Sequence, residues 1–305
     1  IGLSFESFVI ERWMRERDVF VSAAKELGAE VNVQNANGDV EEQISQIEYF
    51  IKKQVDVIVV VAGDCEALSD VMIKAREAGI KTVSYDRLIM NAGCDLYISF
   101  DNTEVGRLMA ESMLENIPDG GDIFLIQGPL TDNNVSLIRE GIDETLAGSN
   151  LNVVYEANCP GWIAENAYTY TKEGLKLDRN VKGIICGNDD LASQAFRALS
   201  EERLAGKVCV TGQDGDLAAC QRIVEETQEM TAFKSVEQEA SLAAKCAVLL
   251  GLGEEIEEVQ DTAYDGTYNV PYLELQPIAV TKENMDEVII KGGFHAKEDV
   301  YLNVN

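Results

Sequence analysis

The chain has 305 residues, 46% of them hydrophobic and 26% charged, and this length is sufficient for two ordinary globular domains. Its 54 acidic and 25 basic residues give a net charge of −29, which repels phosphate groups and argues against nucleic acid or an anionic membrane as a partner. No apolar run approaches the roughly 20 residues that a membrane-spanning helix needs, so we expect no direct membrane insertion.

Strand-like and helix-like segments alternate along the whole chain. Continuous apolar runs, such as the five residues 57–61, are typical of strands that are buried on both faces of a parallel sheet. The expected strands are residues 1–5, 31–35, 57–61, 81–85, 122–127, 153–155, 181–186 and 208–213. The expected helices are residues 15–27, 40–53, 67–78, 103–116, 135–147, 164–177, 192–199 and 241–250. This alternation predicts an α/β fold with doubly wound, mainly parallel sheets.

The number of strands exceeds what one sheet holds comfortably, so we predict two similar lobes. The first break falls at residues 98–102, where a strand runs directly into a helix. Neither a Pro/Gly-rich linker nor a short-period repeat marks this break.

The seven cysteines cannot all pair with one another, because their number is odd, and no Cys-x-x-Cys occurs. Free thiols suit the cytosol, or the outside of a cell that lives without oxygen. We therefore predict no metal site from these residues.

The motifs of common enzyme classes are missing. The sequence contains no Gly-x-Ser-x-Gly, no His-Glu-x-x-His, no Gly-Lys-[Ser/Thr] phosphate loop, and no Gly-x-Gly-x-x-Gly after the first strand. The single histidine, His295, is interpreted as structural. Asp189 and Asp190 could form a glycosidase pair, but adjacent residues diverge in direction. We predict a protein that is not an enzyme and that holds no cofactor.

Polar side chains follow the predicted strands, at the edge where open α/β sheets bind ligands. The set in question is Arg12, Asp86, Arg87, Asn133, Asn188, Asp214 and Lys234. Each residue has a plainer interpretation: the Asn and Asp residues as helix caps, Asp86 and Arg87 as a surface ion pair, and Lys234 as a solvated charge. Their recurrence at strand ends in both halves of the chain favours a ligand site.

The only two tryptophans, Trp13 and Trp162, also follow strand-like runs in polar, loop-like settings. Indole faces cover the C–H faces of a sugar ring, while Asp accepts from sugar hydroxyl groups and Arg, Asn or Lys donates to them. The combination predicts binding of a neutral, hydroxyl-rich ligand.

The sequence resembles the periplasmic sugar-binding proteins of bacterial transporters over essentially its whole length. The resemblance rests on Glu11-Arg12-Trp13, Gln34-Asn35-Ala36-Asn37-Gly38, Tyr85-Asp86-Arg87, Tyr97-Ile98-Ser99-Phe100-Asp101-Asn102, Asp132-Asn133-Asn134, Gly161-Trp162 and Gly212-Gln213-Asp214. Xylose-binding members of the family are the most similar in these motifs. Glu6–Ile10 is less polar than in the transporter relatives, and Asp190 replaces a small residue.

The resemblance implies two Rossmann-like lobes that are joined by a three-segment hinge and close on the sugar. The lobes it implies are residues 1–102 with 236–274, and residues 103–235 with 275–305. The implied ligand-binding residues are Arg12, Trp13, Asp86, Arg87, Asn133, Trp162, Asn188, Asp214 and Lys234.

The function that the resemblance implies is extracytoplasmic binding of a monosaccharide, D-xylose or a similar pentose foremost, for delivery to the membrane permease of an ABC importer. The protein is expected in the periplasm or on the outer cell surface, with anchoring left open. The alternative is a xylose-sensing receptor that docks on a sensor histidine kinase or a chemoreceptor. A third possibility, a repressor's ligand domain, would need DNA-binding helices before Ile1.

Overall fold

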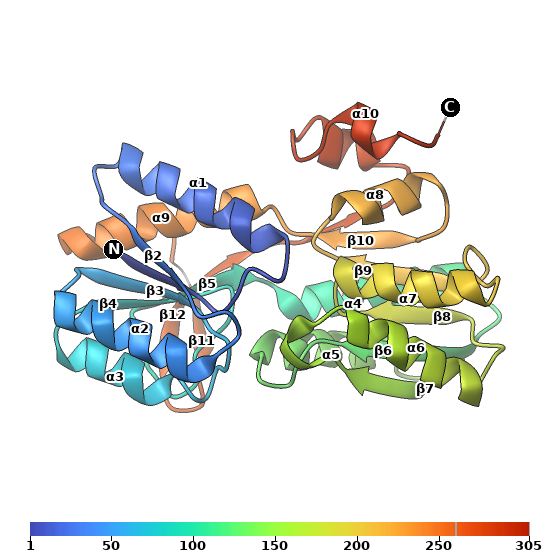
Figure 1. Cartoon of the computed structure of the whole chain (residues 1–305), viewed down its shortest axis with the longest axis horizontal. Coiled ribbons are helices and arrows are strands. Elements are labelled where there is room, and N and C mark those ends of the chain that lie inside the picture. The colour runs from blue at the N-terminus through green and yellow to red at the C-terminus, as the bar shows by residue number, and fades with distance from the viewer. Residues whose placement is uncertain (260, 305) are drawn as a thin grey trace. The chain divides into compact units, whose positions relative to one another are not determined.

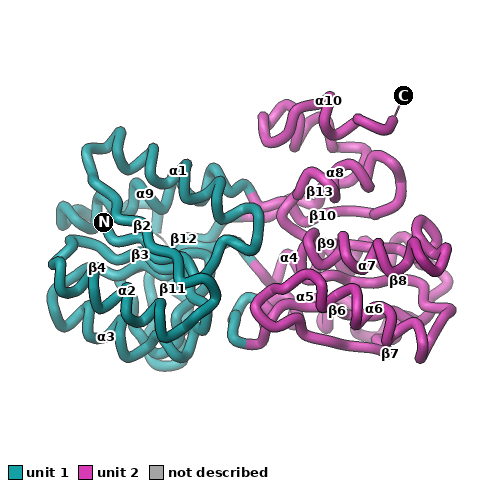
Figure 2. Tube along the Cα trace, viewed as in Figure 1, with its two compact units in different colours: residues 1–101, 131–134, 235–275 teal, residues 102–130, 135–234, 276–305 magenta. Residues whose placement is uncertain are grey.

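The computed structural model describes residues 1–259 and 261–304 and divides into two compact units (Figure 2). Unit 1 comprises residues 1–101, 131–134 and 235–275, and unit 2 comprises residues 102–130, 135–234 and 276–305. By their contacts, residues 131–134 group with unit 1, whereas the range 103–235 expected for the second lobe includes them. The chain also passes from one unit to the other at 101–102, 234–235 and 275–276.

Unit 1 is built on a sheet with the strand order β11-β12-β5-β4-β3-β1-β2. Its strands are β1 (Gly2–Phe5), β2 (Asn32–Asn35), β3 (Val57–Val61), β4 (Lys81–Tyr85), β5 (Leu96–Phe100), β11 (Asp261–Tyr264) and β12 (Asn269–Leu275). Its helices are α1 (Arg12–Glu26), α2 (Val40–Lys53), α3 (Ser69–Glu77) and α9 (Val236–Leu252). Helices α1 and α9 lie together on one face of the sheet and α2 and α3 on the other (Figure 1). All strand pairs are parallel except the β11–β12 hairpin.

Unit 2 has a sheet with the order β13-β10-β9-β8-β6-β7, in which only the β10–β13 pair is antiparallel. Its strands are β6 (Gly121–Gln127), β7 (Leu151–Asn158), β8 (Gly183–Cys186), β9 (Cys209–Gln213), β10 (Met230–Phe233) and β13 (Ile278–Val280). Its helices are α4 (Asn102–Asn116), α5 (Asn133–Leu146), α6 (Glu165–Leu177), α7 (Asp189–Glu201), α8 (Leu217–Val224) and α10 (Lys297–Val300), with short helical turns at Pro160–Trp162 and Asp286–Ile290.

Each sheet is buried between helices, as the apolar runs predict. All five residues of β3 are inaccessible to solvent, and Ile58 and Val60 pack on Ile47 and Phe50 of α2. In unit 2, helices α4 and α5 bury Met109 and Ile142 with Leu125 of β6 in a second core. The prediction of two doubly wound α/β lobes is therefore confirmed, and it places the carboxyl ends of the parallel strands at one edge of each sheet.

The sequence predictions differ from the structure at several element ends. Helix α1 begins at Arg12 rather than at residue 15, so Arg12 and Trp13 lie in its first turn and not in a loop. Strands β10, β11, β12 and β13 and helices α8 and α10 have no counterpart among the expected elements. Within residues 1–259 and 261–304, no helix has both the length and the apolar character required to cross a bilayer.

Candidate functional site

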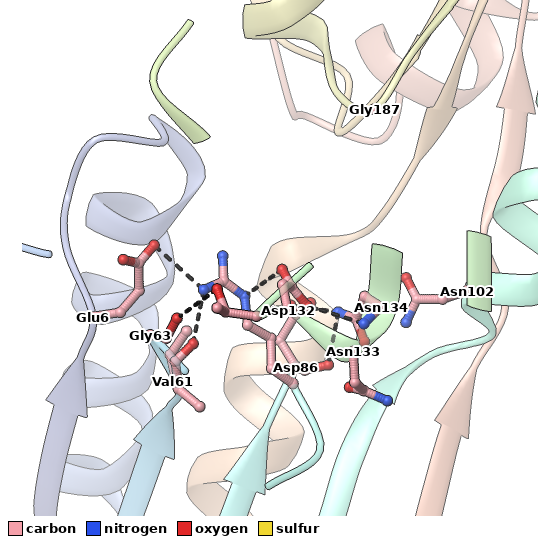
Figure 3. A network of polar contacts seen from close by, with 12 residues as sticks. Glu6, Val61, Gly63, Asp86, Asn102, Asp132, Asn133, Asn134 and Gly187 are labelled. Atoms are coloured by element: carbon pink, nitrogen blue, oxygen red, sulfur yellow. Dashed lines mark hydrogen bonds and ion pairs between the residues drawn. The ribbon is translucent and has the colours of Figure 1, made fainter. Parts of the chain in front are cut away.

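In unit 1 the predicted polar residues gather around the turn that follows β4. Asp86 has a positive φ of 62° in this turn. Its carbonyl oxygen accepts hydrogen bonds from Ser99 Oγ (2.7 Å) and Asn134 Nδ2 (3.1 Å), and the same amide also donates to the Asp86 carboxylate (3.1 Å; Figure 3). The Asp86 side chain is therefore fixed through both its backbone and its carboxylate.

Arg87 is also buried, with 2% of its surface exposed. Its guanidinium donates to the carbonyl of Ala62 (2.8 Å) and forms ion pairs with Asp132 (2.8 Å) and Glu6 (3.4 Å; Figure 3). Burial lowers the pKa of Arg87, but the nearby carboxylates of Asp132, Glu6 and Asp86 together offset that effect and leave its pKa above the usual value. The interpretation of Asp86 and Arg87 as a surface ion pair is wrong, because both residues lie in the interior.

Arg12 and Trp13 enter the same cluster from the first turn of α1. Arg12 contacts the carboxylates of Glu16 (2.5 Å), Glu239 (2.8 Å) and Asp86 (3.2 Å). Its guanidinium carbon also lies 4.4 Å from the centroid of the Trp13 ring, and that of Arg87 lies 5.6 Å away. The ring is therefore oriented by two cations.

Two neighbouring asparagines from the segment 131–134 complete this cluster. Asn133 Oδ1 accepts from the backbone N–H of Leu88 (3.1 Å), so it ties this segment to the turn after β4. Asn134, which is not among the predicted ligand-binding residues, is the residue that donates hydrogen bonds to Asp86. Side chains of consecutive residues at the start of a helix point in different directions, so position after a strand does not distinguish Asn133 from Asn134.

In unit 2, Trp162 closes a short helical turn after β7. It is 5% exposed and has a φ of 56°, and its indole lies against the backbone of two glycines at strand ends. A Cβ atom at Gly128 would lie 2.2 Å from Cζ2 of Trp162, and one at Gly187 would lie 3.2 Å from Cζ3. These two positions leave space for the ring because they carry no side chain.

Asn188 caps helix α7, since its Oδ1 accepts from the backbone N–H of Leu191 (2.9 Å). The capping interpretation is confirmed for Asn188, and this bond leaves the amide N–H groups for other partners. Helix α8 begins at Leu217 with Asp216 at its N-cap, so Asp214 is not a capping residue. Asp214 has a φ of 98° and is buried.

Lys234 directly follows β10 and has only 3% of its surface exposed, so the interpretation as a solvated charge is wrong. Its Nζ donates to Oδ1 of Asn102 (3.2 Å), the first residue of α4, which is also buried. Both groups lie in unit 2 at a point where the chain enters or leaves that unit.

Backbone conformation sets three of the predicted residues apart. Eight non-glycine residues in the described chain have a positive φ, and Asp86, Trp162 and Asp214 are among them. Such conformations cost on the order of 1–3 kcal/mol each and are concentrated at ligand-binding and active sites. Strain at these positions is an indication of function that is independent of residue type.

Several buried polar atoms in these two clusters have no hydrogen-bond partner among the described residues. They are Trp13 Nε1 and Asn134 Oδ1 in unit 1, and Gln127 Nε2 and Gln213 Oε1 in unit 2. An unpaired buried polar group costs about 1–3 kcal/mol, so these atoms indicate a polar ligand. Within the described ranges, no group of three or more His, Cys, Asp or Glu residues could hold a metal ion.

Sequence reasoning missed the residues that support the predicted ones. Glu16 could have been found from its i, i+4 spacing to Arg12. Glu239 is 227 residues away from Arg12 along the chain, and no local pattern indicates that contact. Gln127 and Gln213 end two predicted strands and were available to the same argument that selected Asp214.

Comparison with known proteins identifies the family to which the chain is similar. A family model described as a periplasmic binding protein domain matches residues 1–255. The D-xylose-binding periplasmic proteins of Haemophilus influenzae and Escherichia coli are 44% and 40% identical, over 99% and 98% of this chain and 92% of each relative. An ABC transporter solute-binding protein from Clostridium phytofermentans, solved with bound β-D-glucose, is 26% identical and has a TM-score of 0.90, with 98% of this chain and 99% of that chain covered. All three are binding proteins, in agreement with the prediction that the chain is not an enzyme.

Proposed function

Because this chain belongs to the periplasmic binding protein family, we propose that it binds a monosaccharide outside the cytoplasm, D-xylose foremost. The ligand-binding residues that we propose are Arg12, Trp13, Asp86, Arg87 and Asn133 from unit 1, and Trp162, Asn188, Asp214 and Lys234 from unit 2. To these we add Asn134, Gln127 and Gln213.

The observation that carries this proposal is the set of buried polar atoms without a hydrogen-bond partner in the polar clusters of both units. They include one donor and one acceptor in each unit. A sugar hydroxyl both donates and accepts, so it satisfies either kind of atom. The guanidinium groups of Arg12 and Arg87 already face carboxylates, and this arrangement favours a neutral ligand over an anion.

Isothermal titration calorimetry of the purified protein tests the proposal against xylose, ribose, arabinose and glucose. We expect xylose to bind with a Kd of about 1 μM, which is about −8 kcal/mol and lies within the efficiency limit for a ligand of about ten heavy atoms. Trp13→Ala and Trp162→Ala should each weaken binding by about 1–3 kcal/mol, because each loses the apolar contact of an indole with the sugar ring. Absence of heat with every pentose would refute the assignment.

For the partner, we propose the membrane permease of an ABC sugar importer. Deletion of the gene should then abolish xylose uptake. If uptake persists and only xylose-induced transcription is lost, the partner is instead the extracellular domain of a sensor kinase.

A further inference from the structure

The guanidinium of Arg12 is surrounded by carboxylates from three different elements of unit 1. Glu16 lies one turn further along α1, Glu239 lies in the first turn of α9, and Asp86 follows β4. Arg12 Nε donates to Glu16 Oε1 (2.5 Å), and Nη2 donates to Glu239 Oε2 (2.8 Å). The Arg12 side chain is therefore fixed by two carboxylates without any ligand.

Glu16 and Glu239 are themselves fully buried. The second carboxylate oxygen of Glu16 accepts from the Tyr85 hydroxyl, which fixes the carboxylate plane from the opposite side. Both residues project from helices, the most rigid elements available to a site. Neither lies at a strand end, so neither belongs to the proposed set of ligand-binding residues.

Stability alone does not account for this arrangement. One guanidinium faces three carboxylates at 6% exposure or less, and buried ion pairs of this kind are often less stable than apolar packing of the same volume. An arginine side chain that is not held loses rotamer freedom on binding, and that loss weakens affinity. Fixing the guanidinium in advance removes this cost from the binding step.

We propose that Glu16 and Glu239 are positioning residues for sugar binding, which hold the guanidinium of Arg12 beside Asp86 and over the Trp13 ring. The inference rests on the proposed function, because Arg12 is taken as a ligand-binding residue there. It assigns a role in affinity to two residues that need not touch the sugar. The geometry that carries it is the pair of bonds from Nε and Nη2 to carboxylates on two helices.

The test is a double-mutant cycle on xylose affinity, measured by calorimetry on the full chain. Glu239→Ala should weaken binding by about tenfold or more, the range that loss of one charged hydrogen bond corresponds to. Glu239→Gln, which keeps an oxygen for Nη2, should restore most of that loss. Arg12→Lys cannot span both carboxylates, so Glu239→Ala should cost little further affinity in that background.

Glu237→Ala is the matched control, because Glu237 joins the same two helices through Arg15 (2.6 Å) but lies half-exposed. It should leave affinity unchanged. Each variant is also melted to confirm that it folds. Wild-type affinity in both Glu239→Ala and Glu16→Ala would overturn the inference while leaving sugar binding intact. The inference would also be overturned if the fold-losses in xylose affinity of Arg12→Lys and Glu239→Ala multiply in the double variant. A wild-type protein that binds no monosaccharide would overturn the proposed function itself.

Discussion

The indole of Trp162 lies directly against the backbone of Gly128, so that a Cβ atom at position 128 would lie 2.2 Å from Cζ2 of the ring. Gly128 follows the last residue of β6, and Trp162 comes from the turn after β7. Contacts this close require the ring to move if a side chain is added. The position of the Trp162 ring in unit 2 therefore depends on residue 128 being a glycine.

Gly128→Ala should displace the Trp162 ring and weaken sugar binding by about 1–3 kcal/mol, which is the range for loss of an aromatic contact. The tryptophan emission of the ligand-free protein should shift as well, since the ring leaves its buried position. Calorimetry and fluorescence measure the two effects. Gly251→Ala, in helix α9 with its nearest contact at 3.2 Å, is the control and should change neither. Normal affinity in Gly128→Ala would show that the position of Trp162 does not matter.

Asp189 is the support of the turn that carries Asp214. Its carboxylate accepts from the backbone N–H groups of Gly215 (3.0 Å) and Asp216 (3.1 Å), and from the side chains of Thr231 (2.7 Å) and Gln228 (3.0 Å). On the other side of the turn, the ring of His295 bonds the Gly215 carbonyl (2.8 Å), in agreement with the structural interpretation of this histidine.

Asp189→Asn should therefore weaken sugar binding through Asp214. The new amide places an N–H group where a donor is already present, and a lost charged hydrogen bond costs about 1.5–3 kcal/mol. Titration calorimetry measures the affinity, and a thermal melt measures the stability. Asp190→Asn, one residue further along α7, leaves the four bonds of Asp189 in place and should bind as the wild type does. Equal losses of sugar affinity in Asp189→Asn and Asp190→Asn would show that Asp189 has no specific role in binding.

Glu16 should make stability depend on pH. Burial raises its pKa to about 7 from the usual 4.5, and the Asp86 carboxylate adds to the increase while Arg12 opposes it. The folded state thus keeps a proton that the unfolded chain releases. The stabilising effect is complete below 4.5 and is lost as the pH rises towards 7.

Glu16→Gln carries no titrating group, so its free energy of unfolding should fall less than that of the wild type between pH 5 and pH 7. The difference in slope cannot exceed ~1.4 kcal/mol per pH unit for one group. Urea unfolding at several pH values measures it, with Glu237→Gln as the exposed control. Parallel pH profiles for the wild type and Glu16→Gln would contradict the pKa assigned to Glu16.

The site residues that could be predicted from sequence are those that directly follow the parallel strands. Asp86, Arg87 and Asp214 follow strands that apolar runs reveal, and a parallel sheet places all such ends at one edge. The start of α1 was missed because the polar sequence before residue 15 resembles a loop. Strand β12 was missed because Pro271 and Glu274 interrupt its apolar pattern.

Contacts between distant segments could not be predicted in the same way. The bond from Arg12 to Glu239 depends on α1 and α9 packing side by side, which tertiary structure alone determines. The four bonds of Asp189 likewise join α7 to β10, to the segment just before β10 and to the turn after β9. Local sequence identifies a charged residue at the start of a helix, but its partner lies in another part of the unit.

The seven cysteines should be unreactive in the folded protein. None is in a disulfide, all but Cys209 are buried, and burial raises the pKa of Cys65 and Cys159 to about 12. Only thiolates react quickly, so a chromogenic disulfide reagent at pH 8 should label no more than Cys209. In urea all seven should react. Fewer than seven in urea would indicate a disulfide, and rapid labelling of several in the folded protein would contradict the burial.

At Lys234, one substitution should have different effects on sugar binding and on stability. Its ammonium is buried beside Asn102, and a charge in such a position costs free energy that a methionine of similar length would not. Lys234→Met should therefore weaken sugar binding by about tenfold, the value of one charged hydrogen bond, while the melting temperature of the ligand-free protein stays the same or rises. Calorimetry and thermal denaturation measure the two quantities on one sample.

Lys282→Met, which replaces an exposed lysine of the same unit, is the control for loss of a charge. If Lys234→Met binds xylose normally but unfolds at a lower temperature, Lys234 is a structural residue and does not belong to the binding set.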